Sequence, residues 1–320
     1  MPRLPLASFD WGKGMTSALR RDVEFQSQGI TCRAWAYIPA NGATRPAPCI
    51  VMAHGLGGTR DAGLVPYAKR FVDAGYFVLL FDYRHLGASD GEPRQLILIS
   101  RQLEDWTSAI AFARRMEGVD PRRIALWGSS FSGGHVLVAA ARDRQIAAVS
   151  AQCPMMDGAA SLRMVARYAG LGAIVRLGRA ALIDAVRSAL RKEPYYVPVV
   201  AMPGQTAAMT SDDAYEGFRA IAPPEWRNEM AARLFLTTPF YRPARYARAV
   251  RCPSLIIACM RDSVVSSRAA VAAAARMGDK ARLVKLPIGH FDVYVGEWFE
   301  RASQEQVSFF GTHLNRGTPT

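Results

Sequence analysis

The sequence predicts an α/β fold, with a mostly parallel sheet, helices on both of its faces and a helical insertion late in the chain. Three observations support this prediction. Short, continuous apolar runs alternate with segments of helical spacing between residues 49 and 153. The alternation stops at Pro154 and resumes near residue 246. Half of the 320 residues are apolar and 21% are charged, which is typical of a globular protein with a large core.

The first half of the chain predicts an edge hairpin followed by alternating strands and helices. Apolar and polar residues alternate on both sides of Gly29, which is typical of an antiparallel hairpin over residues 21–26 and 30–38. Before it, residues 1–18 carry scattered Pro, Gly and apolar residues, and we expect a loosely ordered arm there. Buried strands are expected at residues 49–53, 76–81, 123–127 and 146–151, and helices at residues 61–74, 99–118 and 132–142.

Residues 154–245 break this rhythm and predict a helical cap, inserted into an α/β core made of residues 1–153 and 246–320. Residues 161–192 and 226–238 have helical character. Four arginines of the first segment fall within an arc of about 120°, opposite an apolar side: Arg176, Arg179, Arg187 and Arg191. We interpret this segment as a helix pair packed on the core with its arginines in solvent. A helix resting on an anionic membrane surface is the alternative interpretation.

The strand and helix pattern resumes after the cap. Residues 254–259 and 281–286 predict two more strands, and residues 267–277 and 296–314 predict helices. Polar residues that can carry chemistry follow both strands: Asp262 comes after the first and His290 after the second. Because parallel strands end at the same edge of a sheet, these side chains are expected at one edge.

A corner of small residues after the strand at 123–127 is the strongest functional signal. It reads Gly-Ser-Ser-Phe-Ser-Gly-Gly over residues 128–134. A strand that turns this sharply into a helix holds its apex residue in a strained conformation, and only small flanking residues fit. The apex hydroxyl then stands at the top of the sheet, with helix N-terminal N–H groups behind it to stabilise an anion. We therefore predict that Ser130 is a nucleophile and that Ser129 and Ser132 have packing or hydrogen-bonding roles.

Four motifs make the chain resemble the α/β-hydrolases over residues 20–153 and 246–315. They are His54-Gly55-Leu56-Gly57 after one strand, Gly128-x-Ser130-x-Ser132-Gly133 after another, and then Asp262 and His290, in the order Ser, Asp, His that this family uses. The resemblance implies the α/β-hydrolase fold and a serine esterase or lipase type of chemistry. One position departs from the family pattern, because Ser132 stands where a glycine is usual. We expect the small serine side chain to fit the tight strand–helix contact.

The expected chemistry gives each of these residues a role. A serine hydroxyl is a poor nucleophile at neutral pH and needs a base within hydrogen-bond reach. We assign that role to His290, with Asp262 fixing its tautomer and stabilising the imidazolium. The resemblance places the two oxyanion-hole N–H groups on Leu56 and Phe131. Asp157 is the main rival for the acid, because it follows the strand after the corner.

The remaining histidines receive structural roles. His54 is expected to shape the oxyanion loop, and His85, in the turn after Asp82, is expected to be structural or exposed at the rim of the site. His135 lies inside the helix that follows the corner and is expected to pack there. His313 lies near the end of the chain, where we expect it to be exposed.

The predicted activity is hydrolysis of a carboxylic ester, or a related acyl bond, through an acyl-enzyme on Ser130, without a metal or an organic cofactor. A cap over the site favours a small-molecule acyl or ester substrate that is partly hydrophobic. Cleavage of amides or peptides, and hydrolysis of carbon–carbon bonds, are alternatives on the same triad. A non-catalytic ligand-binding protein with the same fold is a less favoured alternative.

Charge and cysteine content limit the partners and the compartment. The formal net charge is +13, but the basic residues are spread along the chain without a cluster, so no nucleic-acid partner is expected. The five cysteines lack a metal-binding spacing, which favours reduced thiols and a cytoplasmic location. No apolar signal segment is expected at residues 1–14, and no run of about 18 apolar residues predicts a transmembrane span. The oligomeric state is open between a monomer and a homodimer.

Overall fold

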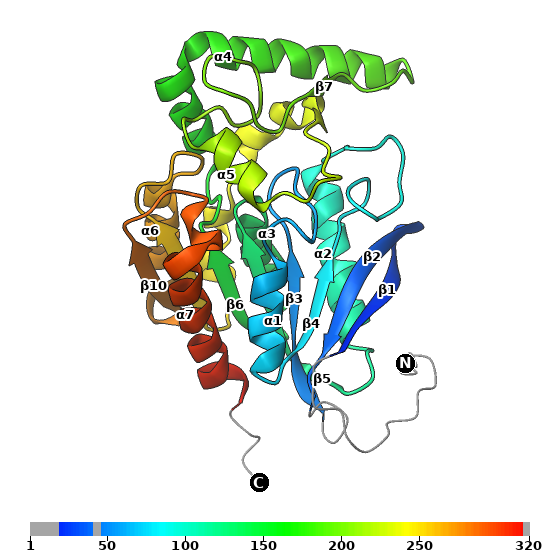
Figure 1. Cartoon of the computed structure of the whole chain (residues 1–320), viewed down its shortest axis with the longest axis vertical. Coiled ribbons are helices and arrows are strands. Elements are labelled where there is room, and N and C mark those ends of the chain that lie inside the picture. The colour runs from blue at the N-terminus through cyan, green and yellow to red at the C-terminus, as the bar shows by residue number, and fades with distance from the viewer. Residues whose placement is uncertain (1–18, 41–45, 316–320) are drawn as a thin grey trace.

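The computed structural model describes residues 19–40 and 46–315 (Figure 1). The arm expected over residues 1–18 lies outside the described residues. One central sheet contains the strands β1 (Leu19–Ser27), β2 (Ile30–Ile38), β3 (Ala47–Ala53), β4 (Phe77–Phe81), β5 (Val119–Ser129), β6 (Ile146–Gln152), β9 (Ser254–Cys259) and β10 (Ala281–Leu286). The helices around it are α1 (Val65–Asp73), α2 (Ile99–Ala113), α3 (Phe131–Arg142), α6 (Ser267–Met277) and α7 (Gly296–Leu314).

The sheet has eight strands in the order β1-β2-β4-β3-β5-β6-β9-β10. The edge hairpin β1–β2 and its contact with β4 are antiparallel, and every other neighbouring pair is parallel. This arrangement confirms the predicted fold class. It also explains why the central strands are apolar at almost every position, because helices cover both faces of a parallel sheet.

The two faces of the sheet carry separate hydrophobic clusters. Helices α1 and α7 pack together on one face, with Trp127 in that cluster. Helices α2, α3 and α6 cover the opposite face, with Trp106 in that cluster (Figure 1). Both tryptophans are fully buried. The two layers hold the carboxyl ends of β5, β9 and β10 at one edge, which is where parallel α/β sheets place their ligand sites.

The segment between β6 and β9 lies over that edge (Figure 1). It contains α4 (Gly158–Ala189), β7 (Tyr196–Val197), α5 (Ala214–Ile221), β8 (Met230–Ala231) and the 3₁₀ helices η1 (Ala232–Leu236), η2 (Thr238–Phe240), η3 (Pro243–Arg245) and η4 (Ala247–Ala249). Gly170, with φ of 77°, divides α4 into two helices that meet at an angle. No helix in the described ranges is long and apolar enough to cross a membrane.

The later part of this segment differs from the sequence-based expectation. We expected a helix over residues 226–238, but these residues form the two-residue strand β8 and short 3₁₀ turns, whereas α5 was not anticipated. Hydrogen bonds to distant residues explain the difference. The Trp226 indole donates to the Gly57 carbonyl over 2.7 Å, and the Asn228 amide bonds the backbone of Val200. Such contacts override a weak local helix propensity.

A buried ion pair ties α4 to η1. The Asp184 carboxylate is fully buried and accepts three hydrogen bonds from Arg233, two from its guanidinium and one from its backbone N–H, over 2.7–2.9 Å. It also accepts the Tyr195 N–H over 2.8 Å. A buried carboxylate needs this complete set of donors, because a lost partner leaves an uncompensated charge. The pair therefore fixes the position of α4 over the sheet edge.

Candidate active site

The corner between β5 and α3 has the strained geometry that the sequence predicted. Ser130 has φ of 57° and ψ of −119°, and it separates the last residue of the strand from the first residue of the helix. A Cβ atom at Gly128 would lie 2.4 Å from the Ser132 carbonyl oxygen, and one at Gly133 would lie 2.7 Å from the Pro154 Cβ. Backbones approach so closely here that only glycine fits at both positions.

Ser132, the residue in place of the usual glycine, is held by a hydrogen-bond network behind the corner. Its hydroxyl lies 2.9 Å from the Tyr83 hydroxyl, and the Trp106 indole donates to that same Tyr83 oxygen over 2.9 Å. All three side chains are buried. The Ser132 hydroxyl therefore bonds to Tyr83, which in turn contacts Trp106 of α2. A serine in place of the usual glycine thus fills space behind the corner, and its buried hydroxyl has a hydrogen-bond partner.

Three of the predicted site residues meet at the sheet edge. The Ser130 Oγ lies 3.0 Å from the His290 Nε2, and the His290 Nδ1 lies 2.6 Å from the Asp262 Oδ2. The second Asp262 oxygen accepts the N–H groups of Val264 and Val265, each over 2.8 Å. These bonds leave Nδ1 as the proton donor to Asp262, so the Nε2 lone pair faces the Ser130 hydroxyl.

Burial and charge act in opposite directions on the His290–Asp262 pair. Burial lowers the pKa of His290, but the Asp262 carboxylate raises it, and the net pKa lies well above the ordinary value for histidine. Burial raises the pKa of Asp262 above its ordinary value, although the His290 ring partly offsets this. An imidazolium at this position is therefore stabilised by its carboxylate partner.

The loop after β3 lies directly against Ser130. A Cβ atom at Gly55 would lie 3.0 Å from the Ser130 Cβ, so the loop and the corner are in backbone contact. Leu56 lines the space around Ser130. The Phe131 N–H is in the first turn of α3, where helix N–H groups have no partner within the helix. Both predicted oxyanion-hole residues therefore lie beside Ser130, Leu56 in the shared cavities and Phe131 as the next residue of the chain.

His54 and Asp82 hold this loop in place through hydrogen bonds. The His54 Nδ1 lies 2.9 Å from the Gly55 carbonyl oxygen, and the His54 ring lies against Tyr83. Asp82 accepts the backbone N–H of Arg60 over 2.7 Å and of Ala88 over 3.1 Å, so it bonds both the loop and its own turn.

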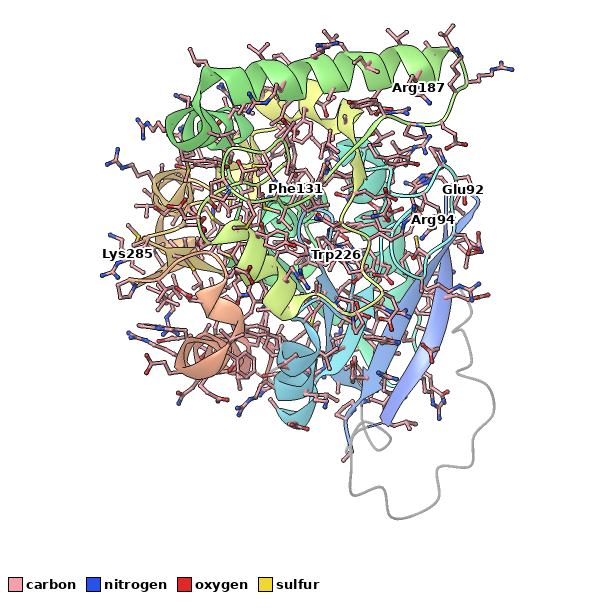
Figure 2. All side chains as sticks on the ribbon, turned by 45° about the horizontal axis from the view of Figure 1, so that its top comes forward. Glu92, Arg94, Phe131, Arg187, Trp226 and Lys285 are labelled. Carbon is pink, nitrogen blue, oxygen red and sulfur yellow. The ribbon has the colours of Figure 1, made fainter. Side chains whose placement is uncertain are left out.

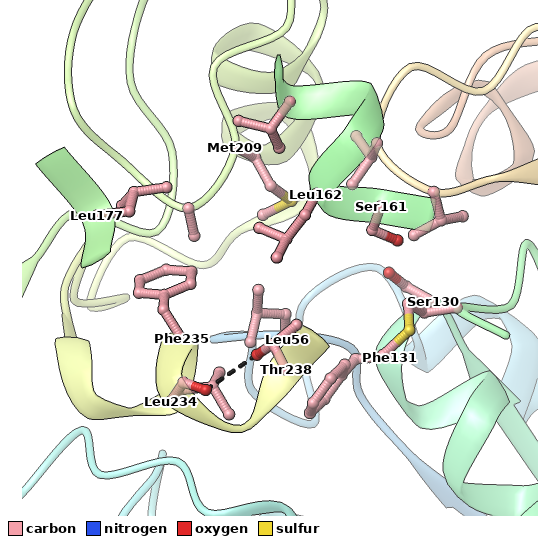
Figure 3. A pocket seen from close by; sticks show the side chains of 15 residues that line it. Leu56, Ser130, Phe131, Ser161, Leu162, Leu177, Met209, Leu234, Phe235 and Thr238 are labelled. Carbon is pink, nitrogen blue, oxygen red and sulfur yellow. Dashed lines mark hydrogen bonds between the residues drawn. The ribbon is translucent and has the colours of Figure 1, made fainter. Parts of the chain in front are cut away.

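Two cavities meet at Ser130. The first has an empty volume of about 620 Å³, opens to solvent, and is lined mainly by apolar side chains from α4, η1 and the core. In Figure 3, Leu177 and Phe235 lie at the end away from Ser130. The second has an empty volume of about 370 Å³ and is lined by His290, Phe291 and other residues. Ser130 therefore lies between an apolar chamber and a chamber that contains the imidazole.

The structure does not bring the rival acid to the imidazole. Asp157 caps α4, where its carboxylate accepts the Ala160 N–H over 2.9 Å. His135 is buried between the Tyr241 hydroxyl and the Gln102 amide oxygen, at 2.6 and 2.9 Å. His85 is buried beside Arg101, at 2.9 Å.

Some residues around the site were not singled out from the sequence. Tyr294 lines the second cavity, and its hydroxyl lies 2.5 Å from the Ser129 hydroxyl. Cys153 lies behind the corner, with its sulfur 3.4 Å from the same Ser129 hydroxyl. A signal was available for Tyr294, because it follows His290 by four residues in the same loop region. Across the described ranges, no group of three or more His, Cys, Asp or Glu residues is placed to hold a metal ion.

Comparisons with known proteins agree with this fold. A family model described as X-Pro dipeptidyl-peptidase (S15 family) matches residues 28–292. The quorum-quenching protein AidA of Acinetobacter baumannii is 42% identical over 290 residues, which make up 90% of this chain and 93% of AidA. The thiohydrolase aneE of Aspergillus aculeatus is 31% identical over 224 residues, or 69% of this chain and 65% of aneE. The crystal structure of the α/β hydrolase GrgF from Penicillium matches with a TM-score of 0.77 at 25% identity, covering 92% of this chain and 99% of GrgF.

Proposed function

The chain belongs to the S15 family of α/β-hydrolases, and from this premise we propose that it is a serine hydrolase that cleaves carboxylic esters, or related acyl bonds, through an acyl-enzyme on Ser130. The observation that carries the proposal is the continuous contact from Ser130 through His290 to Asp262, at 3.0 and 2.6 Å. A hydroxyl, an imidazole and a carboxylate in this order form the charge arrangement that activates a serine.

The proposed reaction has two halves. The Ser130 Oγ attacks the carbonyl carbon while His290 Nε2 accepts the hydroxyl proton, and Asp262 stabilises the imidazolium that forms. The N–H groups of Leu56 and Phe131 stabilise the oxyanion. His290 then gives its proton to the leaving alcohol or thiol. The same nitrogen takes a proton from a water molecule that attacks the ester carbonyl, and it gives that proton to the Ser130 Oγ as the ester bond breaks and the acid leaves.

The lining of the two cavities supports an apolar acyl group on one side of Ser130 and the leaving group on the other. The chamber lined by Leu162, Leu177 and Phe235 offers apolar surface for an acyl chain. The chamber lined by His290 is suited to the leaving group, because that group must receive the imidazole proton. A thiohydrolase among the relatives supports testing thioesters beside oxygen esters.

Peptide cleavage is the second candidate, because the matching family model is described as a dipeptidyl-peptidase. A dipeptidyl-peptidase must bind the free amino terminus of its substrate, and an ammonium group in a cleft needs an anionic partner. Among the described residues that line the two cavities, none is acidic. This lining favours an uncharged acyl group over a peptide amino terminus.

The state of the cysteines supports a cytoplasmic location for this proposed hydrolase. All five are free and buried, as is usual in a reducing compartment.

A labelling and turnover experiment tests the proposal. A fluorophosphonate probe is expected to form an adduct on Ser130, and p-nitrophenyl esters are expected to be hydrolysed. Ser130→Ala should lose both, while Ser132→Ala, with its hydroxyl bonded to Tyr83, is the matched control that keeps both. The substrate panel contains nitrophenyl esters of rising chain length, an acyl-CoA and an X-Pro p-nitroanilide. Full turnover by Ser130→Ala would refute the proposal, and preference for the anilide would favour the peptidase.

A further inference from the structure

The second half of α4 has an unusual distribution of apolar residues. Its inner face packs on the protein and carries Ala173, Leu177, Ala180, Ala181 and Asp184. Its outer side is also apolar, although it faces solvent. Five residues there are 58–75% exposed and follow one another at spacings of four, seven, four and four: Leu171, Val175, Leu182, Val186 and Leu190. On a helix these spacings form a single stripe along the outside. We call it the outer stripe.

Basic residues border the outer stripe on one side, and acidic residues are missing from it. Residues 158–192 contain a single acid, Asp184, which is fully buried against Arg233. The same residues contain seven bases: Arg163, Arg167, Arg176, Arg179, Arg187, Arg191 and Lys192. At 100° per residue, Arg176 and Arg187 lie on one flank of the helix, between the outer stripe and the buried face, and Arg179 lies at the edge of the stripe on the same side. Figure 2 shows α4 across the top of the molecule, with Arg187 toward one end.

We propose that the outer stripe of α4 docks on the surface of a phospholipid bilayer that contains anionic lipids. A helix with an exposed apolar stripe and a basic flank is the arrangement that lies in the plane of such an interface. Its apolar side chains enter the acyl boundary, and its arginines contact lipid phosphates. The helix from residue 171 to residue 189 is about 28 Å long, at 1.5 Å per residue, which gives a continuous contact line.

The charge distribution favours this occupant over a second copy of the chain. If two copies of α4 met through their outer stripes as antiparallel helices, the two-fold axis would place the arginine flank of both helices on the same side of the interface. The two rows of arginine would then face each other along the seam. The opposite flank carries Ile174, Gly178 and Ala185 and offers no acid to compensate. Like charges in such positions oppose pairing, whereas an anionic bilayer neutralises them.

Docking by α4 would also bring the bilayer next to the apolar cavity. Leu162, Val165 and Leu177 of the same helix line that cavity from the inside. A lipophilic acyl substrate dissolved in the membrane would then have a short path to Ser130. This consequence for the substrate rests on the proposed function, but the docking itself does not.

Vesicle co-sedimentation tests the docking. The full-length protein is mixed with vesicles of phosphatidylcholine alone, or of phosphatidylcholine with phosphatidylglycerol. We expect binding to the mixed vesicles that weakens as salt is raised. The double variant Leu171→Asp/Leu182→Asp should bind at least tenfold more weakly. Arg179→Gln/Arg191→Gln should also bind about tenfold more weakly, because each base near an anionic surface contributes to the attraction.

Controls separate this result from folding and from catalysis. Val295→Asp changes an exposed apolar residue outside α4 and should bind like the parent protein. Ser130→Ala should bind like the parent as well, so a failure of the proposed hydrolase activity does not affect the test. Circular dichroism establishes that the variants are folded. Absent binding, equal binding to both vesicle types, or binding unchanged by the α4 variants would overturn the proposal. So would a dimer in sedimentation velocity that the α4 variants dissociate.

Discussion

His290 is under two opposing influences that determine how activity depends on pH. Its ring must be neutral to accept the Ser130 proton. The Asp262 carboxylate raises the pKa of the ring against the effect of burial. We therefore expect kcat/KM for p-nitrophenyl acetate to rise with pH, with the midpoint of the acid limb above about 6.5, the ordinary value for histidine. The measurement is a kcat/KM profile from pH 5 to pH 9.

Asp262→Asn sharpens this prediction. Without the carboxylate, burial is the largest influence left on the His290 pKa and lowers it, so the acid limb should shift to lower pH. The rate at neutral pH should fall roughly 10³- to 10⁴-fold, because the imidazolium loses its partner and the tautomer is no longer fixed. Asp157→Asn is the control, since that carboxylate caps α4. An acid limb that stays in place in Asp262→Asn would contradict the assignment of the carboxylate.

Ser132 gives a second prediction for a single residue. Its hydroxyl shares a buried network with Tyr83 and Trp106 rather than with the reacting groups. Ser132→Ala should lower the free energy of unfolding by about 1 kcal/mol, because a buried hydrogen-bond partner is lost. Its kcat/KM should stay within about twofold of the parent value. Urea denaturation and ester turnover measure the two quantities, and a hundredfold loss of turnover in a stable variant would place Ser132 in the reaction.

The corner between β5 and α3 shows how an element junction depends on glycine. In Gly128→Ala, the added Cβ would meet the Ser132 carbonyl oxygen at 2.4 Å, so strand and helix must separate. We expect a loss of about 1–3 kcal/mol or more in the free energy of unfolding, together with lower activity. Gly178→Ala is the matched variant, because a Cβ there meets nothing within 4 Å on α4. It should gain roughly 0.5–1 kcal/mol from helix propensity. The midpoint of urea denaturation should fall for Gly128→Ala and rise for Gly178→Ala. Equal midpoints for the two variants would refute this explanation of the corner.

The elements differ in how far the sequence predicts them. The core strands were predictable, because burial on both faces makes runs such as β4 continuously apolar. The Ser130 corner and the residues after β9 and β10 were predictable because their positions follow from motif and chain order. Residues 226–238 were not, because Trp226 and Asn228 are fixed by hydrogen bonds to segments far away in the sequence. In α4 the expected arginine arc is present, but the exposed outer stripe emerged only when the structure separated the buried apolar residues from the exposed ones.

At the scale of the whole molecule, the sheet supplies the reacting groups and the inserted segment supplies most of the apolar walls. Ser130, Asp262 and His290 follow β5, β9 and β10, whereas Leu162, Leu177 and the η1 residues lie over them. The Asp184–Arg233 pair joins the two walls of the insertion, α4 and η1, at 2.7 Å. On the proposed function, the catalytic groups and the selection of acyl-chain length belong to different parts of the protein, and we expect that each can be changed without the other.

Leu177 is the position at which this separation can be tested. It lies at the far end of the apolar cavity from Ser130, on the inner face of α4 (Figure 3). In Leu177→Trp, the larger side chain would fill the end of the chamber and exclude about three methylenes of a long acyl chain. At about 0.8 kcal/mol each, this lowers kcat/KM for p-nitrophenyl decanoate roughly 50-fold. Turnover of the acetate ester should be unchanged, because a two-carbon acyl group stays beside Ser130. Met202→Trp, at an exposed residue of the same insertion, is the control that keeps the parent profile. If Leu177→Trp lowered acetate and decanoate turnover equally, the first cavity would not be the acyl site. The acyl chain of the substrate would then have to lie in the chamber beside His290.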